Sequence, residues 1–291
     1  ETDVAEFLQA LAQGLLIGST YGLLALGMGL VYGVSGVVNF SHGDFISLGM
    51  FMCLALYSAF AMDPYVSLII TVPVMTVIGG LVYWYLLRPM VGHQFLMVVQ
   101  LTLGLSLVLQ NGILMVFGGQ PARTPSVVES KLLILGDVVV RVPHVIAFVV
   151  SFAMAIGLYI MLRSTDFGRS IRAVHQNAHS AALMGIDVSR VQTLTFALGI
   201  GILAIAAALL LPGTPIQPAQ GLRYTVITLI VVALGGMTNF VGIMLGGLII
   251  GLSEAYGTIY LSDTLGMLLP YGIFVLIMLF RPQGLTWSSS R

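Results

Sequence analysis

The apolar residues of this chain come in long runs separated by short polar breaks. A run of about twenty apolar residues is long enough to cross the hydrocarbon core of a membrane as a helix. The runs predict helices over Phe7–Tyr32, Phe45–Ala61, Val66–Leu87, Phe95–Phe117, His144–Leu162, Val191–Leu211, Tyr224–Leu234, Val241–Tyr260 and Leu265–Phe280. The first run is longer than one crossing needs and the seventh is short. We therefore expect an all-α polytopic membrane protein with about 8–10 transmembrane or half-membrane helices.

Composition supports the same class. The chain is 58% hydrophobic and 8% charged, whereas soluble domains carry about 25% charged residues. So few charged residues cannot cover the surface of a protein dissolved in water, and we therefore expect the chain to be surrounded by lipid. We expect residues 1–291 to form a single transmembrane domain. The 34 glycines suit helices that approach closely in a bilayer. The formal net charge of +0 gives no global attraction to nucleic acid.

One segment, Arg163–Arg190, is strongly polar. Read as one helix, it has an apolar stripe and a polar stripe at helical spacing. The apolar stripe is Ile171, Val174, Ala178, Ala181 and Ala182, and the polar stripe is Arg169, Arg172, Gln176 and His179. Ser164, Thr165 and Asp166 offer N-cap side chains, and Gly185 suits the position after the C-terminus. The pattern predicts a short amphipathic helix between two spans, which either docks onto a partner or lies on the bilayer surface.

Arginine and lysine in short loops mark the cytoplasmic side of a membrane protein. If Arg163–Arg190 is cytoplasmic, alternation of the spans places Arg88, Arg281 and Arg291 on that side as well. The other side then holds Arg123, Lys131, Arg141 and Arg223 together with most of the acids. We expect an outside N-terminus and a cytoplasmic C-terminus. The external loop 118–143 contains Leu133–Val140, which reads as a small hairpin turning at Gly136-Asp137.

Two apolar stretches are interrupted by glycine and polar residues. The first, Gly33–Asp44, is too apolar for a solvated loop and too polar for an ordinary span. Non-helical backbone at membrane depth is tolerated only where protein buries it or where it lines a cavity. Asn39, His42 and Asp44 are therefore candidates for a substrate pathway or its gate. Each also has a structural alternative: Asp44 as N-cap of a helix from Phe45, Asn39 as partner of freed backbone groups, His42 as an interfacial hydrogen-bonding group.

The second interruption runs from Gly235 to Gly242, and broken helices in both halves of a chain are typical of transporter binding sites. Gly242, Gly246 and Gly247 also suit close helix packing. Glu254 is the one acid well inside a predicted span. An intramembrane carboxylate indicates a functional site; the alternative is that Glu254, which lies near the outer end of the span, only reaches water. We include it in the predicted pathway.

The sequence contains none of the common motifs for nucleotide binding, metal binding or nucleophilic catalysis. There is no G-x-x-x-x-G-K-[ST] phosphate loop, and the single lysine, Lys131, lies in the external loop. No Cys/His cluster has metal-binding spacing, and no G-x-S-x-G nucleophile motif is present. We therefore expect no enzymatic activity, no catalytic residue, no metal site and no cofactor bound by this chain. It is either a passive pathway or a subunit driven by another protein.

Several motifs match one known family in order along the chain. Asn39-Phe40-Ser41-His42-Gly43-Asp44-Phe45, followed by Leu48-Gly49, resembles the N-F-[AS]-H-G-[DE] signature of branched-chain amino acid ABC-transporter permeases of the LivH type. The other matching stretches are Arg172–Asn177, Ala181–Asp187, Leu234–Met237 and Phe280–Leu285. The resemblance covers nearly the whole chain, from the first span to Leu285.

The resemblance implies a plasma (inner) membrane permease of a bacterium or archaeon that forms half of a translocation pathway. Its implied partners are a second homologous permease, most simply in a heterodimer, two cytoplasmic ATPase subunits that bind ATP and Mg, and an external substrate-binding protein. Segment 163–190 would couple to the ATPase. Its implied coupling residues are Arg169, Arg172, His175, Gln176, Ala181, Ala182, Gly185 and Asp187. Alternatives are a urea or short-amide importer of the same family, or a self-sufficient channel or secondary carrier that uses Glu254.

Overall fold

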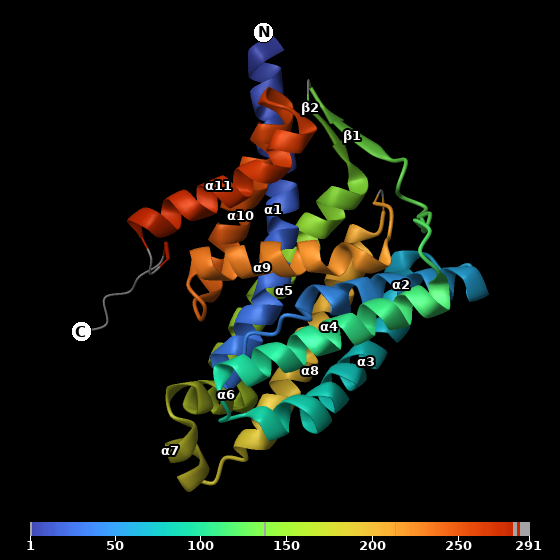
Figure 1. The fold of residues 1–291 in the computed structure, drawn as a ribbon. Helices are drawn as coiled ribbons and strands as arrows, with labels where there is room; N and C mark the ends of the chain where they lie inside the picture. The colour runs from blue at the N-terminus through green and yellow to red at the C-terminus, as the bar shows by residue number, and fades with distance from the viewer. Residues whose placement is uncertain (1, 137, 213, 282–283, 286–291) are drawn as a thin grey trace.

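The computed structural model describes the whole chain except residues 1, 137, 213, 282–283 and 286–291, and its described part is almost entirely helical (Figure 1). The helices are α1 Thr2–Ser35, α2 His42–Phe60, α3 Pro64–Val82, α4 Phe95–Phe117, α5 Val142–Ser164, α6 Asp166–Gln176, α7 Ala178–Leu183, α8 Val188–Leu210, α9 Gly221–Gly235, α10 Phe240–Tyr260 and α11 Asp263–Phe280. Helix α3 is extended by a π-helical turn, Tyr83–Leu87, and a 3₁₀ turn, Arg88–Met90. Another 3₁₀ turn, Pro218–Gln220, immediately precedes α9.

The predicted polytopic architecture is confirmed. Within the described residues, eight helices are long and apolar enough to cross a membrane, and a shorter apolar helix, Thr264–Phe280, follows them. The long first run is a single helix of 34 residues. The seventh run is the 15-residue α9, which the preceding 3₁₀ turn lengthens.

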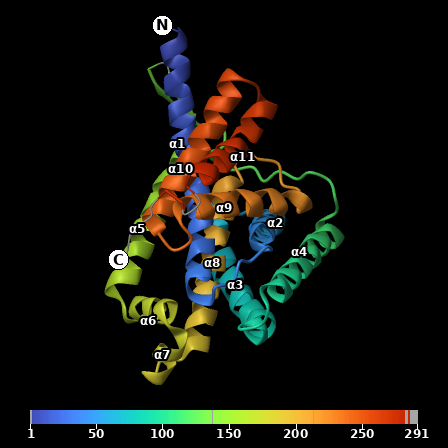
Figure 2. The ribbon, with the colours of Figure 1, turned by 60° about the vertical axis from the view of Figure 1, so that its left-hand side comes forward.

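Helix α1 is the axis of the molecule, and α5, α8, α9 and α10 pack around it (Figures 1 and 2). Its closest neighbour is α10, because glycines face one another where the two helices cross. A Cβ atom on Gly251 would lie 2.3 Å from the Cα of Gly18, and one on Gly247 would lie 2.6 Å from the Cα of Gly22. The predicted close packing through Gly246 and Gly247 is thus confirmed, since a Cβ on Gly246 would lie 2.9 Å from the Val231 carbonyl oxygen.

The outer helices expose apolar side chains in the way expected of a surface in lipid. The exposed side chains of α3 and α4 include Val66, Ile69, Val77, Leu81, Leu96, Leu107, Val108 and Met115. Such a surface would be an aggregation hazard in water. It is suited to acyl chains or to another apolar subunit.

The predicted hairpin is present as strands β1 Leu132–Leu135 and β2 Val138–Arg141, which pair antiparallel with Leu135 opposite Val138. Gly136 has the positive φ of 64° that a tight hairpin requires. Asp137, the other residue of the predicted turn, lies outside the described residues. The Gln9 side chain on α1 donates to the Val139 carbonyl at 2.8 Å and accepts from the Val139 amide at 2.9 Å. The hairpin is therefore attached to the N-terminal part of α1.

The prediction of one amphipathic helix in segment 163–190 is wrong in its continuity. The segment forms α6 and α7, which meet at Asn177. The backbone of Asn177 is extended, and its side-chain oxygen accepts from the Ser180 amide at 2.9 Å, so it caps α7. Capping by asparagine outcompeted helix continuation. As a result the predicted apolar stripe is interrupted: Ile171, Val174 and Ala181 are buried, whereas Ala178 and Ala182 are exposed.

The predicted helix-end residues of this segment are partly confirmed. Thr165 provides the N-cap of α6, and its hydroxyl oxygen accepts from the Gly168 amide at 3.0 Å. Gly185 follows α7 with a φ of +85°. Asp187, which was not among the predicted helix-end residues, caps α8: its carboxylate accepts from the Arg190 amide at 3.0 Å. The segment thus joins α5 to α8 through two short capped helices.

Candidate functional site

The first interruption predicted from the sequence, Gly33–Asp44, is here called the first break. It brings the start of α2 back beside the middle of α1. After α1 ends at Ser35, residues 36–41 run without helix until α2 begins at His42. The His42 ring is buried and its Nε2 donates to the Leu24 carbonyl at 3.0 Å. Leu24 lies eleven residues before Ser35, which is about 16 Å along a helix. The non-helical segment therefore runs from the exposed Gly36 back to a buried His42 beside the middle of α1.

Asn39 stabilises the turn into α2. Its Oδ1 accepts from both the amide and the hydroxyl of Ser41, at 3.1 and 2.6 Å. This is the structural role considered for Asn39 from the sequence. Its Nδ2 is buried and has no hydrogen-bond partner among the described residues, and the same holds for Nδ1 of His42. The break thus keeps unused polar groups beside α1.

The prediction that Asp44 caps α2 is wrong, because α2 begins two residues earlier and Ser41 occupies the cap position. Asp44 is fully buried in the first turn. Its Oδ1 accepts from Nε2 of Gln110 on α4 at 2.9 Å, while Oδ2 has no partner among the described residues. Its carboxylate also lies in the first turn of a helix, where negative charge is favourable.

Helices α2 and α9 cross at their first turns. A Cβ on Gly43 would lie 1.9 Å from the Gly221 carbonyl oxygen, so only glycine fits there. The Gly43 amide donates to the Thr225 hydroxyl at 2.9 Å. The carboxylate of Asp44 lies against Gly221, since a Cβ there would be 2.3 Å from Oδ1. The start of α9 therefore fixes the position of the break.

Glu254 lies on the other side of the same α9 turn. Its Oε1 accepts from Arg223 at 3.1 Å and its Oε2 from the Tyr21 hydroxyl at 2.7 Å. The Glu254 side chain is 14% exposed and that of Arg223 is 46% exposed. Glu254 thus joins α1, α9 and α10 in one polar cluster and remains partly exposed. The cluster lines a cavity of about 300 Å³.

The second predicted break is a four-residue turn, Gly236–Asn239, between α9 and α10. Gly236 has a φ of +86°, and Asn239 caps α10 by accepting from the Gly242 amide at 3.1 Å. The turn contacts the C-terminal part of α1, since a Cβ on Gly29 would lie 3.4 Å from the Met237 carbonyl oxygen. The two breaks therefore both lie against α1, at different heights.

A second cavity, of about 270 Å³, lies between this turn, the end of α1 and segment 163–190. Its lining includes Gly33, Tyr159, Arg172, His175 and Thr238. Nδ1 of His175 on α6 donates to the Gly33 carbonyl near the end of α1. The neighbouring Val34 carbonyl accepts from Gln192 on α8 at 3.3 Å. Segment 163–190 is thus hydrogen-bonded to the helix that ends at the first break.

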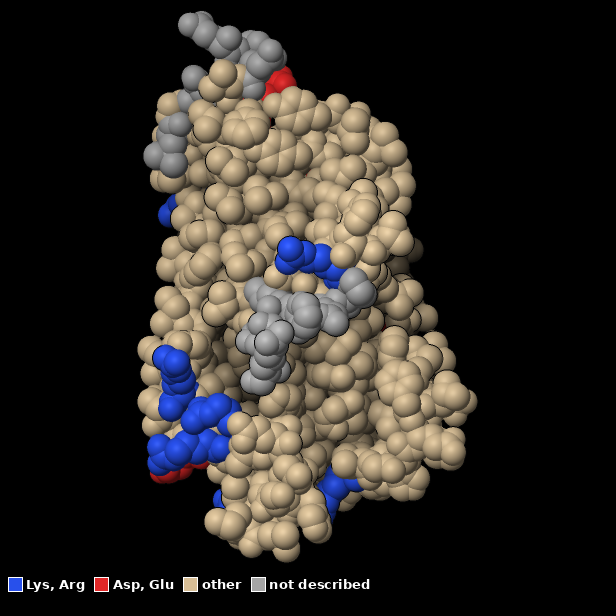
Figure 3. Space-filling view, turned by 90° about the vertical axis from the view of Figure 1, so that its left-hand side faces the viewer, with Lys and Arg blue, Asp and Glu red and all other residues tan. Residues whose placement is uncertain are grey.

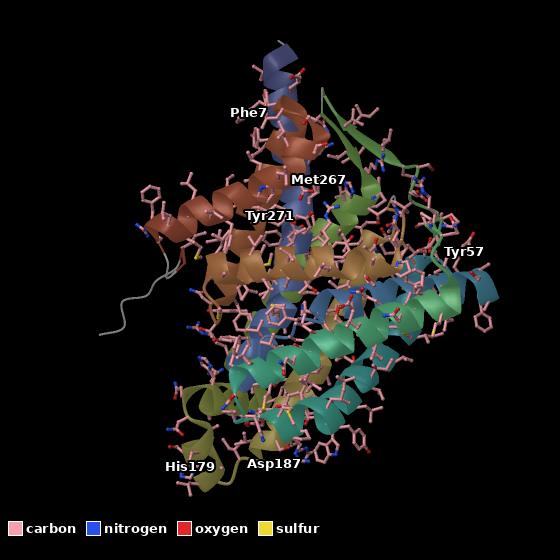
Figure 4. The ribbon with its side chains drawn as sticks, viewed as in Figure 1. Phe7, Tyr57, His179, Asp187, Met267 and Tyr271 are labelled. Carbon is pink, nitrogen blue, oxygen red and sulfur yellow. The ribbon has the colours of Figure 1, made fainter. Side chains whose placement is uncertain are left out.

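The outward side of this segment is charged and partly apolar. Figure 3 shows a largely uncharged face with basic side chains gathered near its lower end, and Figure 4 places His179 and Asp187 at the end of the molecule opposite Phe7. Arg169, which pairs with Asp166, and Arg172 are exposed, as is Gln176. The last residue of α7, Leu183, is 75% exposed and the following Met184 is 83% exposed.

The structure therefore divides the predicted site residues into three groups. Asn39, His42 and Asp44 meet at the first break, Glu254 lies in the polar cluster beyond α9, and the predicted coupling residues lie on α6, α7 and the turn to α8. Sequence reasoning missed Tyr21, Gln110, Gln192 and Arg223. Three of these are uncharged residues in apolar runs, which carry no signal of their own. Arg223 was assigned to a loop, because the helix that carries it is short.

Comparisons with known proteins agree with the motifs. A family profile described as branched-chain amino acid transport system, permease component, matches residues 10–278. The chain is 28% identical to the high-affinity branched-chain amino acid transport system permease protein BraD of Pseudomonas aeruginosa, with 97% of this chain and 96% of the relative covered. It is 29% identical to the LivH permease protein of Escherichia coli K12, covering 96% and 95%.

A probable branched-chain amino acid transport permease protein, LivH of Methanocaldococcus jannaschii, is 30% identical and covers 91% of this chain and 87% of its own. No solved structure matches the chain significantly.

Proposed function

Because the chain belongs to the family of permease components of branched-chain amino acid transport systems, we propose that it carries branched-chain or other hydrophobic amino acids across the plasma membrane as half of an ABC importer's pathway. ATP and Mg bind to separate ATPase subunits, so this chain contributes movement and a route rather than chemistry. Its similar relatives over nearly the full length are transport permeases, and none of its described features favours urea, short amides or a self-sufficient carrier.

The observation that carries the proposal is the order of features along α1. The polar cluster and its cavity lie beside Tyr21, the buried break meets α1 at Leu24, and the second cavity begins at Gly29. Polar groups and cavities thus follow one another along a single helix of a membrane protein. Buried irregular backbone at that depth is the arrangement found where transporters bind or pass their substrates.

Segment 163–190 is the proposed contact with the ATPase subunits. Its inner side packs on the bundle through Ile171 and Val174 and binds Gly33 through His175. Its outer side presents Arg169, Arg172 and Gln176 together with the exposed pair Leu183 and Met184. An apolar pair surrounded by charged residues outside the lipid is suited to a groove on a soluble subunit. A shift of α6 would act directly on the end of α1 and on the cavity beside it.

The proposed assembly follows from this contact. Two ATPase subunits sit below the α7 ends of two permeases, and a second, homologous permease covers part of the exposed apolar surface, with lipid on the rest. An external binding protein delivers substrate to the opposite end, where the hairpin and the loop 118–143 lie. This places the N-terminus outside and the C-terminus in the cytoplasm.

The test is ATP-coupled leucine uptake by the reconstituted assembly. Replacing Leu183→Glu together with Met184→Glu buries two carboxylates in the proposed ATPase contact, and we expect uptake to fall at least tenfold while membrane insertion is unchanged. Leu183→Met together with Met184→Leu is the matched control, since it keeps both exposed side chains apolar. Unchanged uptake in the double glutamate variant, or leucine flux by this chain without ATPase subunits, would overturn the proposal.

A further inference from the structure

The cavity beside Glu254 contains the chemical groups that recognise a zwitterion. Its polar lining is Thr20, Tyr21, Arg141, His144, Thr214, Arg223, Tyr224 and Glu254, and its apolar lining includes Ile17, Ala147 and Leu209. A volume of about 300 Å³ is at the lower end of the range of roughly 300–1,000 Å³ for small-molecule sites. An aliphatic amino acid needs one cationic partner, one anionic partner and an apolar wall, and all three are present.

The charges in this cavity do not balance. Arg223 pairs with Glu254, whereas Arg141 has no ion pair within the part of the chain that the structure describes. With His144 counted as neutral, the residues that line the cavity include two arginines and one carboxylate, and Arg141 also lines a neighbouring hollow that contains Glu129. The surplus positive charge favours an anionic group of a ligand, and guanidinium binds a carboxylate through two parallel hydrogen bonds.

The one carboxylate retains capacity for an ammonium group. Each oxygen of Glu254 accepts one hydrogen bond, from Arg223 and from Tyr21. An ionised carboxylate offers about four acceptor positions, so roughly two remain. A ligand ammonium would add to the cluster without displacing Arg223.

The position of Arg141 is fixed by the fold. It is the last residue of β2 and immediately precedes α5. Arg141 lies opposite Leu132 in the hairpin. Two residues earlier on the same strand, the backbone of Val139 is hydrogen-bonded to the Gln9 side chain of α1. The cavity therefore lies between the proposed external loop and helices α1, α5, α8, α9 and α10. Of these, α1, α5 and α8 extend to the end that carries segment 163–190.

We propose that this cavity is an amino acid binding site within the permease itself, where Arg141 and Arg223 bind the α-carboxylate, Glu254 binds the α-ammonium, and Ile17, Ala147 and Leu209 contact the aliphatic side chain. The inference rests on the proposed function, which supplies the substrate class. It adds that the permease selects for the zwitterion and not only for an apolar side chain.

The experiment measures equilibrium binding of labelled leucine to the complete permease–ATPase assembly in lipid nanodiscs without the binding protein. Two competitors separate the charged groups: 3-methylbutan-1-amine lacks the carboxylate and 4-methylpentanoate lacks the ammonium. We expect leucine to bind saturably and both competitors to bind at least tenfold more weakly. Arg141→Gln should weaken binding of leucine and of 4-methylpentanoate by about tenfold to a hundredfold and leave the amine unaffected. Arg141→Lys should restore part of the loss.

Arg123→Gln is the matched control, because Arg123 lies in the same external loop and does not line the cavity. The thermal midpoint without ligand shows whether each variant is folded. Lack of saturable leucine binding by the wild-type assembly, or an equal effect of Arg141→Gln on acid and amine, would overturn the site. ATP-coupled uptake on the same preparations separates the two proposals. Normal leucine uptake with unaltered binding in Arg141→Gln would reject this site alone, and no amino acid uptake by the wild type would reject the proposed function.

Discussion

Single residues decide how close the helices of this protein come. Gly43 is the clearest case, because α2 and α9 cross there with a backbone carbonyl where a Cβ would be. A glycine inside a helix costs about 1 kcal/mol relative to alanine. At Gly43 that cost is offset by a crossing that no other residue permits, and the crossing places Asp44 and His42.

Gly43→Ala should therefore lower the thermal midpoint of the purified chain in detergent. Overpacking costs about 1–3 kcal/mol in well-packed interiors, and here the clashing atoms belong to the backbone, which yields little. Gly104→Ala is the control, since Gly104 is also helical but, among the described residues, no atom outside its own helix turn lies within 4 Å of its would-be Cβ. That variant should be unchanged or slightly more stable. Equal midpoints for the two variants would contradict the proposed crossing.

For single residues, the sequence indicated which polar side chains are unusual but not which residues they contact. It singled out Asn39, His42, Asp44 and Glu254 because polar groups in apolar runs are unusual. It could not pair Glu254 with Arg223, or Asp44 with Gln110, because 31 and 66 positions separate the partners. Such pairs depend on helix crossings, which no local pattern records. The cap assigned to Asp44 failed for a related reason, since helix starts shift easily by one or two residues.

At the scale of elements, hydrophobic runs predicted the long helices well. A long apolar run in a membrane must satisfy its backbone hydrogen bonds internally, so it forms a helix whatever its tertiary contacts are. The amphipathic segment was harder, because helical spacing on both sides of Asn177 concealed the break. An asparagine within a helix pattern is also an N-cap candidate, and here the cap formed. The two short helices that result let α6 bind the bundle while α7 projects from it.

The contact between α6 and α1 leads to a prediction. His175→Ala removes the hydrogen bond to the Gly33 carbonyl, which is worth about 1 kcal/mol net. Amides of Asp166–Gln176 should then exchange hydrogen several-fold faster in the isolated chain. His179→Ala is the control, because His179 is an exposed residue of the adjoining α7. Unchanged exchange in the His175 variant would show that α6 is held by its apolar side alone.

At the scale of the whole molecule, the two cavities lie near opposite ends of the helices that carry segment 163–190. Helix α5 begins at the cavity beside Glu254 and ends at the one beside His175, a path of about 33 Å at helical rise. Between them, α1 is closed by the tight contacts with α10 and by the buried break. Transport by alternating access then requires the C-terminal end of α1 to move relative to the turn 236–239, while tightly packed helix pairs move together.

A crosslinking experiment tests which contacts move. In a Cys53→Ala background, Gly33→Cys with Thr238→Cys places two thiols across the cavity beside His175, where a Cβ on Gly33 would lie 3.9 Å from the Thr238 methyl group. Gly80→Cys with Ala197→Cys joins α3 to α8, with a Cβ separation of 3.6 Å that suits a disulfide. A short thiol-specific crosslinker should abolish ATP-coupled uptake in the first pair and leave it within about twofold in the second.

The comparison is informative because both pairs lock a contact that the structure contains, and only one of them spans a cavity with room to change shape. Reversal by a reductant excludes damage by the thiols themselves. If locking α3 to α8 stops uptake and locking α1 to the turn does not, the moving boundary lies between those outer helices. The cavity beside His175 would then be a static recess, and force from segment 163–190 would have to travel through α8 instead of through the end of α1.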